Sequence, residues 1–319
     1  MNETLFGASR SLAMQARPFL RWAGGKQRWL GANHQILPKF RGQYIEPFLG
    51  GGSVFFHLVR TEMRPFEAWL GDQNLQLVRT YLSIRNSIDD VIDAVSSIQA
   101  AFVASSDKRR FYESVRDKFN ESLPAVRPEE FIFLNATCWN GLWRTNAKGR
   151  FNVPYGAPKG DRILPSADEL RAASSALQAA KIRACSWETL IGSASPGDFV
   201  FLDPPYFSDH KRGAQAKYGV ETFSFDAHER LADAVVALQD RDVQFVLTNS
   251  AEPELVRMYR ARGLAVKEVQ VPRAISSKTD ERQPVGELIV TNSDSDALRN
   301  MAANAGVLLD LDALRRRRK

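Results

Sequence analysis

The sequence contains only two cysteines, Cys138 and Cys185. Two thiols cannot build a disulfide framework, and by themselves they cannot close a zinc site. No apolar run approaches the roughly 20 residues that a membrane helix needs. The N-terminal residues have no basic stretch leading into a long apolar core, so we expect no signal peptide. These absences predict a cytoplasmic protein with no membrane partner.

The composition excludes the less ordinary classes of chain. Of 319 residues, 44% are hydrophobic and 25% are charged, which argues against disorder, collagen-like repeats and coiled coil. Lys and Arg number 43 against 37 Asp and Glu, a net charge of +6. This excess favours a polyanionic partner but also fits a soluble protein that is simply basic. The run Arg315–Lys319 is either a solvated tail or a phosphate-binding arm.

Strand and helix patterns alternate in two stretches of the chain. Apolar runs predict buried strands at 44–48, 68–71, 199–202, 245–248, 265–271 and 287–291, and helices are predicted at 53–60, 227–238 and 252–262. Such alternation is typical of a largely parallel α/β sheet. Between the two stretches the pattern is mainly helical, with a polar hairpin or loop at 140–160. We therefore predict an α/β domain, 17–82 and 182–293, interrupted by a second domain at 83–181, with tails at 1–16 and 294–319.

The segment Tyr44–Ser53, read as YIEPFLGGGS, is a strand that runs into glycines and then into a helix. Glycines at the carboxyl end of a strand let a nucleotide-like ligand approach the backbone. Phe55 stands where a dinucleotide fingerprint needs its third glycine, which disfavours NAD. Asp72 ends the next strand and is placed either to meet ribose hydroxyls or to cap the following helix. Together they favour an adenosine-containing ligand, with a merely tight strand–helix turn as the alternative.

The segment Asp203-Pro204-Pro205-Tyr206 follows a buried strand and carries the sharpest chemical signal. Prolines remove backbone donors and leave carbonyl acceptors. Asp203 and the Pro204 carbonyl can therefore accept both hydrogens of an exocyclic amino group, which turns the nitrogen lone pair toward an electrophile. The Tyr206 ring offers a surface on which a planar base can stack. The alternative is a rigid exit from the strand with an ordinary surface tyrosine.

An aromatic, glycine-rich and basic cluster, FLRWAGGK at 19–26, precedes the first strand. Lys26 beside paired glycines could reach a carboxylate, and Trp22 could cover an adenosine. Taken on residue chemistry alone, the cluster is better explained as a loop leading into a helix from Gln27.

Five motifs in one order resemble the Dam family of DNA adenine-N6 methyltransferases, the D12 class. They are FLRWAGGK at 19–26, EPFLGGGS at 46–53, NATCWNGLWR at 135–144 continuing to GRFNVPYG at 149–156, DPPY at 203–206, and RAISS at 273–277 followed by GEL at 286–288. They extend from about Pro18 to Thr291. The first sixteen residues and those after Asn292 lie outside the resemblance.

The resemblance implies a Rossmann-like fold that binds S-adenosyl-L-methionine and releases S-adenosylhomocysteine. By motif match, the residues that would bind the cofactor are Trp22, Lys26, Phe48, Gly50, Gly52, Asp72 and Asp203. The catalytic residues would be Asp203, Pro204, Pro205 and Tyr206, and the methyl group would pass directly to N6 of adenine. The adenine must be flipped out of the duplex, at a cost of roughly a few kcal/mol. No metal is implied, because the sulfonium is already an activated electrophile.

The inserted domain matches the family's target-recognition domain, which binds double-stranded DNA. In the family the hairpin matching 139–144 enters the DNA. Trp139 would wedge beside the flipped base with Asn140 and Leu142 nearby, and Arg144 would read a guanine. These matches predict a GATC-like target in an enzyme that is nucleoid-associated and needs no obligate protein partner. The alternative is that Trp139 and Trp143 only pack the hairpin onto the helices.

Five residues depart from the family's pattern. Trp139 replaces a more usual Tyr, and Arg21 replaces a Lys that contacts the first guanine of the target. Ala157-Pro158 stand where better-known members carry basic and aromatic residues, and Lys278 stands where the family tends to have Asn. We expect Arg21 and Lys278 still to contact DNA.

Two other functions stay open on the sequence alone. One is an amino-methyltransferase that acts on RNA or on a glutamine side chain and shares a similar acid-or-Asn–Pro–Pro–aromatic motif. Such enzymes would lack the 140–144 recognition hairpin. The other is a non-catalytic DNA-binding protein that kept the fold, which the intact Asp203, Tyr206, Lys26 and Asp72 disfavour.

Overall fold

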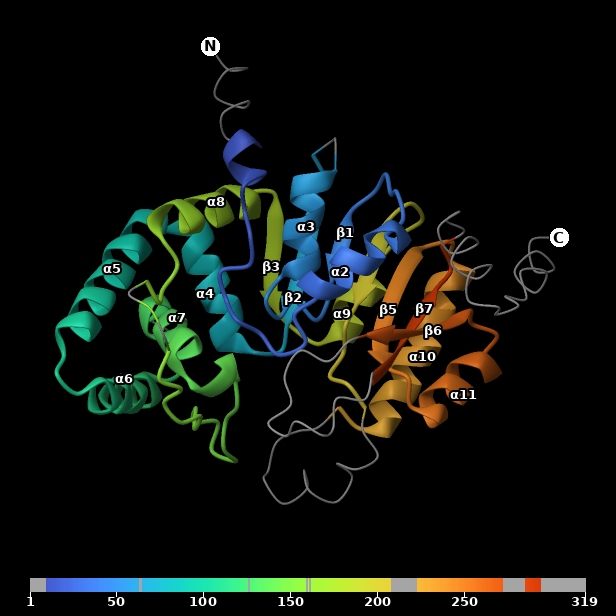
Figure 1. Cartoon of the computed structure of the whole chain (residues 1–319). Helices are drawn as coiled ribbons and strands as arrows, with labels where there is room; N and C mark the ends of the chain where they lie inside the picture. Colours follow the sequence, from blue (N-terminus) through green and yellow to red (C-terminus); the bar gives the residue numbers. More distant parts are fainter. Residues whose placement is uncertain are drawn as a thin grey trace, which may run out of the picture. The chain divides into compact units, whose positions relative to one another are not determined.

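In the computed structural model, strands and helices alternate along most of the chain, except between β2 and β3, where helices follow one another (Figure 1). The structure describes residues 10–62, 65–125, 127–158, 160, 162–207, 223–271 and 285–293. The strands form a seven-stranded sheet with the order β3-β2-β1-β4-β5-β7-β6. This arrangement confirms the predicted α/β fold class. The chain divides into two compact units, and each is described by itself.

The first unit contains 49–187 together with the residues up to 27 and is mainly helical. Its elements are α3 (Ser53–Thr61), β2 (Ala68–Asp72), α4 (Leu75–Asn86), α5 (Ile88–Ala104), α6 (Lys108–Ser122), α7 (Pro128–Thr137), the 3-10 helix η2 (Trp139–Gly141), α8 (Ala167–Leu177) and β3 (Ala180–Ala184). Strands β2 and β3 pair in parallel, from Ala68 opposite Ala180 to Asp72 opposite Ala184. Helix α7 packs against both α5 and α6, so it forms the centre of the helical part.

Local sequence explains where the helices of the first unit begin. The Asn74 side chain caps α4 by accepting hydrogen bonds from the N–H groups of Gln76 and Leu77. Ser166 and Glu169 form a capping box at the start of α8. Pro128 occupies the first turn of α7, where its missing N–H costs nothing. The run Phe131–Leu134 is buried all round, which places this helix in the core.

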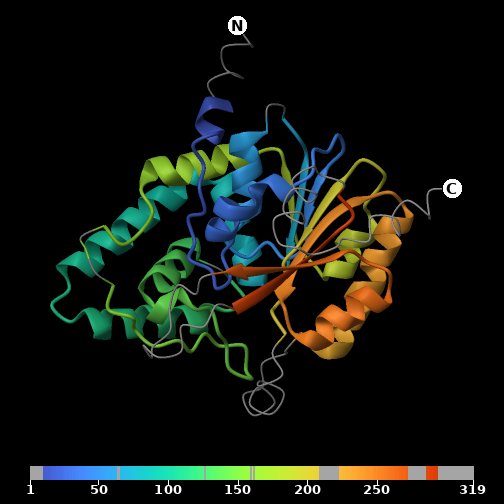
Figure 2. The same ribbon diagram turned by 45° about the vertical axis from the view of Figure 1, so that its right-hand side comes forward.

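The second unit contains 28–48 and most of the chain after 188. Its elements are α2 (Gln27–Asn33), the 3-10 helix η1 (His34–Ile36), β1 (Tyr44–Glu46), α9 (Trp187–Gly192), β4 (Phe199–Leu202), α10 (Phe225–Asp240), β5 (Gln244–Ser250), α11 (Pro253–Ala261), β6 (Val266–Val271) and β7 (Val285–Thr291). Strand β4 is parallel to both β1 and β5. The orange helices α10 and α11 lie beside one another and cover β5 and β6 (Figure 2).

The structure differs from the sequence expectations at three strands. Strand β1 ends at Glu46 rather than at 48, because Pro47 has no N–H to continue the ladder. Strand β3 begins at Ala180, inside the expected helical domain. The sequence does not predict this strand, because only Ala180 and Ile182 are buried in it and its apolar pattern is weak. Strand β7 runs antiparallel to β5 and β6, which makes it an exception within the largely parallel sheet that the sequence predicts.

The compact units do not follow the expected domain boundaries. The expected second domain, 83–181, lies entirely within the first unit, but that unit also contains α3, β2 and β3. A target-recognition domain at 83–181 therefore stays a proposal. Within the described part of the chain, no helix is long and apolar enough to cross a membrane.

His228 is a fully buried titratable group on α10. Its ring meets the Phe223 and Phe207 rings edge-on, at 4.7 and 5.7 Å between centroids. Neither ring nitrogen has a hydrogen-bond partner among the described residues. Burial without a partner disfavours the charged imidazolium and lowers the pKa of His228 to about 4.

This burial predicts a specific loss of stability in acid. Between pH 6.5 and about 4 the unfolded chain protonates His228 and the folded chain does not, so the free energy of unfolding falls as the pH drops through that window. His228→Leu should remove up to about 3 kcal/mol of this pH dependence. Urea unfolding at pH 7.5 and at pH 4.5 measures it. Equal pH dependence in both proteins would contradict a neutral buried imidazole.

Candidate functional site

The glycine turn after β1 is closed by the carboxylate of Asp72. Asp72 Oδ2 accepts a hydrogen bond from Gly50 N at 3.0 Å, and Oδ1 accepts one from Asn74 N at 2.9 Å. Because Asn74 is the cap of α4, the alternative reading of Asp72 as that cap is wrong. Burial raises the pKa of Asp72, while these backbone hydrogen bonds act in the opposite direction. The carboxylate thus lies at the carboxyl end of β2 beside the glycine turn, as expected.

Two glycines of this turn have left-handed backbone conformations. Gly50 has φ +47° and Gly52, which precedes α3, has φ +66°. A Cβ on Gly50 would lie 2.7 Å from the Trp22 ring, so glycine is required for this close approach. The Tyr81 hydroxyl donates to Gly50 O at 3.1 Å and fixes the turn from α4. The turn therefore places Gly50, Gly52, Asp72 and Trp22 together.

Lys26 lies at the end of a tight turn that follows Trp22. Its side chain is 4% exposed, and Nζ donates to Gly24 O at 2.8 Å. Gly24 has φ +80° and Gly25 N donates to Trp22 O, so the chain turns tightly between the tryptophan and the lysine. Helix α2 begins directly after, at Gln27, as the sequence predicts.

The polar segment after α7 folds back on itself as the predicted hairpin or loop. Antiparallel bridges join Cys138 to Tyr155 and Thr145 to Phe151. Asn146 closes the tip, where its Oδ1 accepts hydrogen bonds from the N–H groups of Lys148 and Arg150. From here on, residues 139–156 are called the arm.

Helix α6 supports the returning half of the arm. Asn120 makes a pair of side-chain hydrogen bonds to Phe151, donating to its carbonyl at 2.9 Å and accepting from its N–H at 2.8 Å. The Tyr112 hydroxyl donates to Val153 O at 2.7 Å. The arm is therefore anchored along the helix and its position is fixed in the first unit.

The two tryptophans of the arm have different environments. Trp143 lies 4.0 Å from the Phe131 ring and 4.4 Å from the Phe151 ring, and it stacks on Trp22 at 6.3 Å with the ring planes 17° apart. Trp139, by contrast, is 50% exposed. The packing interpretation thus applies to Trp143 but does not account for Trp139.

The segment that carries Arg21 is joined to α7 and to the arm. Asn135 Oδ1 accepts from Arg21 N at 2.8 Å, and Asn135 Nδ2 donates to Arg21 O at 2.7 Å. Gly141 has φ +62°, and a Cβ there would lie 2.8 Å from Arg21 Cβ. Asn140, with φ +54°, shares this sharp bend. The structure therefore places the Arg21 side chain beside Gly141, in the bend of the arm that also contains Trp139, Asn140 and Leu142.

Arg144 projects from the outgoing half of the arm. Its side chain is exposed, and Nε donates to Asn152 Oδ1 at 2.8 Å. Asn152 N in turn donates to Arg144 O at 3.1 Å. These contacts fix the plane of the guanidinium while leaving it at the surface.

In the second unit, Asp203 leaves β4 beside the end of β5. Leu202 pairs with Leu247, so the next residues, Asp203 and Thr248, are neighbours across the two parallel strands. Thr248 Oγ1 donates to Asp203 Oδ1 at 2.9 Å, and Thr248 is fully buried. The carboxylate therefore occupies the carboxyl end of a central strand, where α/β folds bind their ligands.

Strand β5 also holds the far end of this loop. Asn249 Oδ1 accepts from Phe207 N at 3.1 Å, and Ser250 Oγ donates to Phe207 O at 2.6 Å. Between the two attachments lie Pro204, which is buried, and Pro205, which is exposed.

Tyr206 has an accessible ring and an enclosed hydroxyl. The residue is 36% exposed, while its hydroxyl interacts with the side chains of Thr248 and Glu287. Burial, followed by the Asp203 and Glu287 carboxylates, raises the pKa of the Tyr206 phenol. The phenol therefore stays neutral, and its ring is available for stacking.

Phe48 belongs to the second unit, whereas the glycines that follow it in sequence belong to the first. Its ring meets Phe223 edge-on at 5.7 Å. In the same unit the buried Tyr44 hydroxyl donates to Glu46 Oε2 at 2.8 Å, and burial raises the pKa of Tyr44.

Lys278 and the motif 273–277 lie outside the described residues. No group of three or more potential metal ligands occurs in the part of the chain that the structure describes.

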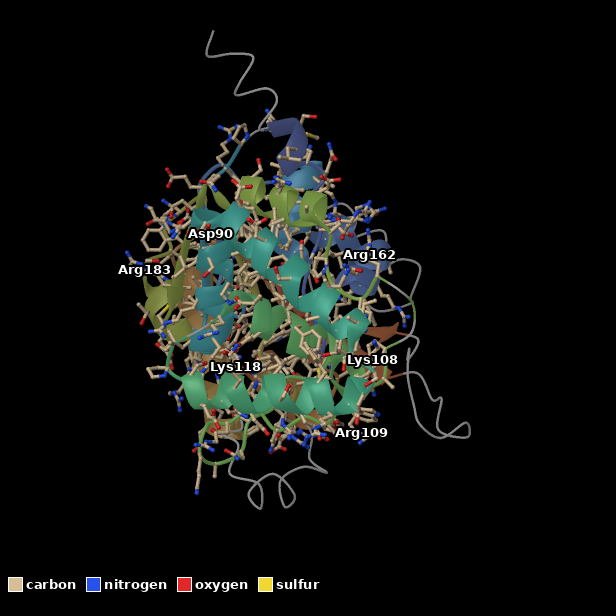
Figure 3. The ribbon with its side chains drawn as sticks, turned by 90° about the vertical axis from the view of Figure 1, so that its left-hand side faces the viewer. Asp90, Lys108, Arg109, Lys118, Arg162 and Arg183 are labelled. Atoms are coloured by element: carbon tan, nitrogen blue, oxygen red, sulfur yellow. The ribbon has the colours of Figure 1, made fainter. Side chains whose placement is uncertain are left out.

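The outer face of the first unit carries basic side chains along α6, where Figure 3 shows Lys108, Arg109 and Lys118. Lys108 Nζ donates to Phe102 O, Val103 O and Ser105 O, so it caps the end of α5. Lys118 lies 3.4 Å from the buried carboxylate of Glu130. Two of these three cations thus have structural roles within the unit.

Comparison with known proteins identifies the family. The model of the "D12 class N6 adenine-specific DNA methyltransferase" matches residues 22–275, which is most of the chain. The chain belongs to this D12 class. It is therefore an adenine-specific DNA methyltransferase, and its substrate is DNA.

Relatives of this D12 methyltransferase match over nearly the whole chain. It is 35% identical to the Type II methyltransferase M.MjaIII of Methanocaldococcus jannaschii, over 88% of this chain and 100% of that one. It is 31% identical to the DNA adenine methylase of Escherichia coli K12, over 86% and 94%. The DNA adenine methylase of Haemophilus influenzae is 30% identical, over 86% and 93%.

Sequence reasoning missed the residues that hold the site in place. Thr248, Asn249 and Ser250 follow the apolar run of β5 directly, and this change to polar residues at the carboxyl end of a strand was the available signal. Asn135 and Asn120 gave no such signal, because their partners are backbone groups 114 and 31 residues away.

The contrast between the two tryptophans predicts opposite effects on stability. Trp143→Ala should lower the free energy of unfolding by about 3 kcal/mol, because it empties the space between Phe131, Phe151 and Trp22. Trp139→Ala should change it by less than about 0.5 kcal/mol, because the ring is half exposed. Urea unfolding of both variants is the measurement. A Trp139→Ala loss as large as that of Trp143→Ala would show that both rings pack the arm.

Proposed function

We propose that this D12 methyltransferase transfers a methyl group from S-adenosyl-L-methionine to N6 of adenine in double-stranded GATC sites, with the adenine flipped out of the duplex. The observation that carries the proposal is the arrangement at the end of β4. There Thr248 fixes the Asp203 carboxylate, prolines follow it, and the Tyr206 ring is exposed with its hydroxyl held.

The residues of the glycine turn fit an adenosine-containing cofactor. Gly50 and Gly52 leave backbone without side chains at the carboxyl end of β1, and Asp72 has further lone pairs that can accept ribose hydroxyls. Trp22 lies against the turn, Lys26 follows Trp22 by four residues, and Phe48 precedes the turn in sequence. We propose that these six residues bind the cofactor, which supplies a methyl group on an electrophilic sulfonium.

The chain's own residues prepare the target amine. Asp203 and the Pro204 carbonyl accept the two N6 hydrogens, so the nitrogen lone pair leaves the plane of the base and becomes nucleophilic. Pro205 restricts the backbone that presents this carbonyl. Tyr206 stacks on the adenine ring and fixes its plane. The pair of acceptors also distinguishes an amino group from a carbonyl oxygen at the same position, because two acceptors facing an oxygen would be left unpaired.

The arm accounts for flipping and for recognition in this proposal. The half-exposed Trp139 fills the space that the displaced adenine leaves in the stack, with Asn140 and Leu142 beside it. Arg144, its plane fixed by Asn152, presents a fork that matches the O6 and N7 acceptors of guanine. Arg21 contacts the first guanine from the adjacent loop, and Lys278 contacts a phosphate. The relatives named DNA adenine methylase support the choice of target.

Methylation mapping tests the proposed target. Labelled S-adenosyl-L-methionine and unmethylated plasmid should give N6-methyladenine confined to GATC, and Asp203→Ala should give none while binding DNA within about threefold of wild type. With 2-aminopurine at the target position, binding should raise the fluorescence if the base leaves the stack. Modification at another sequence would overturn the reading of the arm but keep the chemistry. Full turnover by Asp203→Ala would remove its proposed role.

Arg144 and Lys148 form a matched pair of exposed cations on the arm. Arg144→Ala should lower discrimination by about 1–3 kcal/mol at one base pair, because a guanine fork is lost. Lys148→Ala should weaken binding equally for all sequences if this lysine acts as an exposed point charge on the phosphate backbone. Competition binding with a series of single-base variants of GATC separates the two outcomes. A uniform loss for Arg144→Ala would make it a phosphate contact.

A further inference from the structure

The loop from Asp203 to Phe207 depends on its neighbours for its position. Pro204 and Pro205 have no N–H, so two successive residues cannot donate a backbone hydrogen bond to any strand. The attachments that the structure does show come from the three last residues of β5. Thr248 binds at Asp203, and Asn249 and Ser250 bind at Phe207.

Thr248 differs from its neighbours in what it contacts. Asn249 and Ser250 hold backbone groups, which any sequence would offer. The Thr248 hydroxyl instead meets two functional side chains, the Asp203 carboxylate at 2.9 Å and the Tyr206 hydroxyl. Tyr206 is held a second time by Glu287 of β7. One buried hydroxyl thus lies between the group that would accept the amine hydrogens and the group that would stack on the base.

The strand itself has no need of this hydroxyl. Thr248 is fully buried beside Leu247 and opposite Ile289, where valine would have the same shape and pack equally well. A buried hydroxyl is tolerated only when it is hydrogen-bonded. The Thr248 hydroxyl has its hydrogen-bond partner in the loop, and the loop is held in turn by this hydroxyl.

We propose that Thr248 is a positioning residue for methyl transfer: its hydroxyl sets the rotation of the Asp203 carboxylate and the tilt of the Tyr206 ring. The carboxylate oxygen that accepts from Thr248, Oδ1, is directed to β5. This role rests on the proposed function of Asp203 and Tyr206. It assigns no chemical step to Thr248, which acts only through those two side chains.

Three variants separate this role from packing. Thr248→Val keeps the shape and removes the hydroxyl, while Thr248→Ser keeps the hydroxyl. Thr291→Val is a matched control, because Thr291 is also a buried threonine of the sheet whose hydroxyl donates to a backbone carbonyl, Phe245 O at 2.6 Å. Each is compared with wild type in single-turnover methyl transfer, in DNA affinity and in thermal unfolding.

Thr248→Val should slow the single-turnover rate by about tenfold to a hundredfold, because misplaced reacting groups cost rate rather than binding. Its DNA dissociation constant should stay within about threefold of wild type. Thr248→Ser and Thr291→Val should keep the rate within about threefold, with Thr291→Val losing as much thermal stability as Thr248→Val. A wild-type rate for Thr248→Val, equal slowing by Thr248→Ser, or equal slowing by Thr291→Val would overturn the proposal. No transfer to DNA by the wild-type protein would instead refute the proposed function, and the role of Thr248 with it.

Discussion

Two consecutive prolines at the end of a central strand impose the constraint on which the candidate catalytic loop depends. They make the backbone stiff and rich in acceptors, and they also deprive it of the donors with which loops are usually tied to a sheet. Side chains of β5, and not its backbone, make the hydrogen bonds described for this loop. A threonine, an asparagine and a serine in succession on β5 hold the two ends of the loop. The parallel register of β4 and β5 brings these residues to the loop without any insertion or long connection.

In the first unit, a series of close contacts joins the glycine turn to the arm. Asp72 closes the glycine turn, the turn contacts Trp22, and Trp22 stacks on Trp143 at the base of the arm. Trp143 in turn lies between Phe131 of α7 and Phe151 of the arm. Aromatic rings with few rotatable bonds therefore join the glycine turn to the arm. A shift of the glycine turn would have to be matched by a shift of the arm.

The sequence was sufficient for the strands and helices whose apolar pattern is strong, such as Phe199–Leu202, and for the position of Asp72 and Asp203 at the ends of strands. It was insufficient where the determining contact is distant in the chain or where a strand buries little. Strand β3 escaped notice because only Ala180 and Ile182 are buried in it. The sequence left Asp72 either to meet ribose hydroxyls or to cap the following helix, and only the geometry assigns that cap to Asn74. Thr248 reads as an ordinary strand residue until its neighbour across the sheet is known.

Close approaches of the backbone limit which substitutions the arm can accept. A Cβ on Gly156 would lie 2.4 Å from Cys138 O, and one on Gly141 would press on Arg21. Asn135 holds Arg21 by both its N–H and its carbonyl. An arm with a different backbone would therefore have to fit the Arg21 loop and helix α7 as they stand in this chain. The arm, the 19–26 segment and α7 are thus in direct contact, and a change in the backbone of one requires matching changes in the other two.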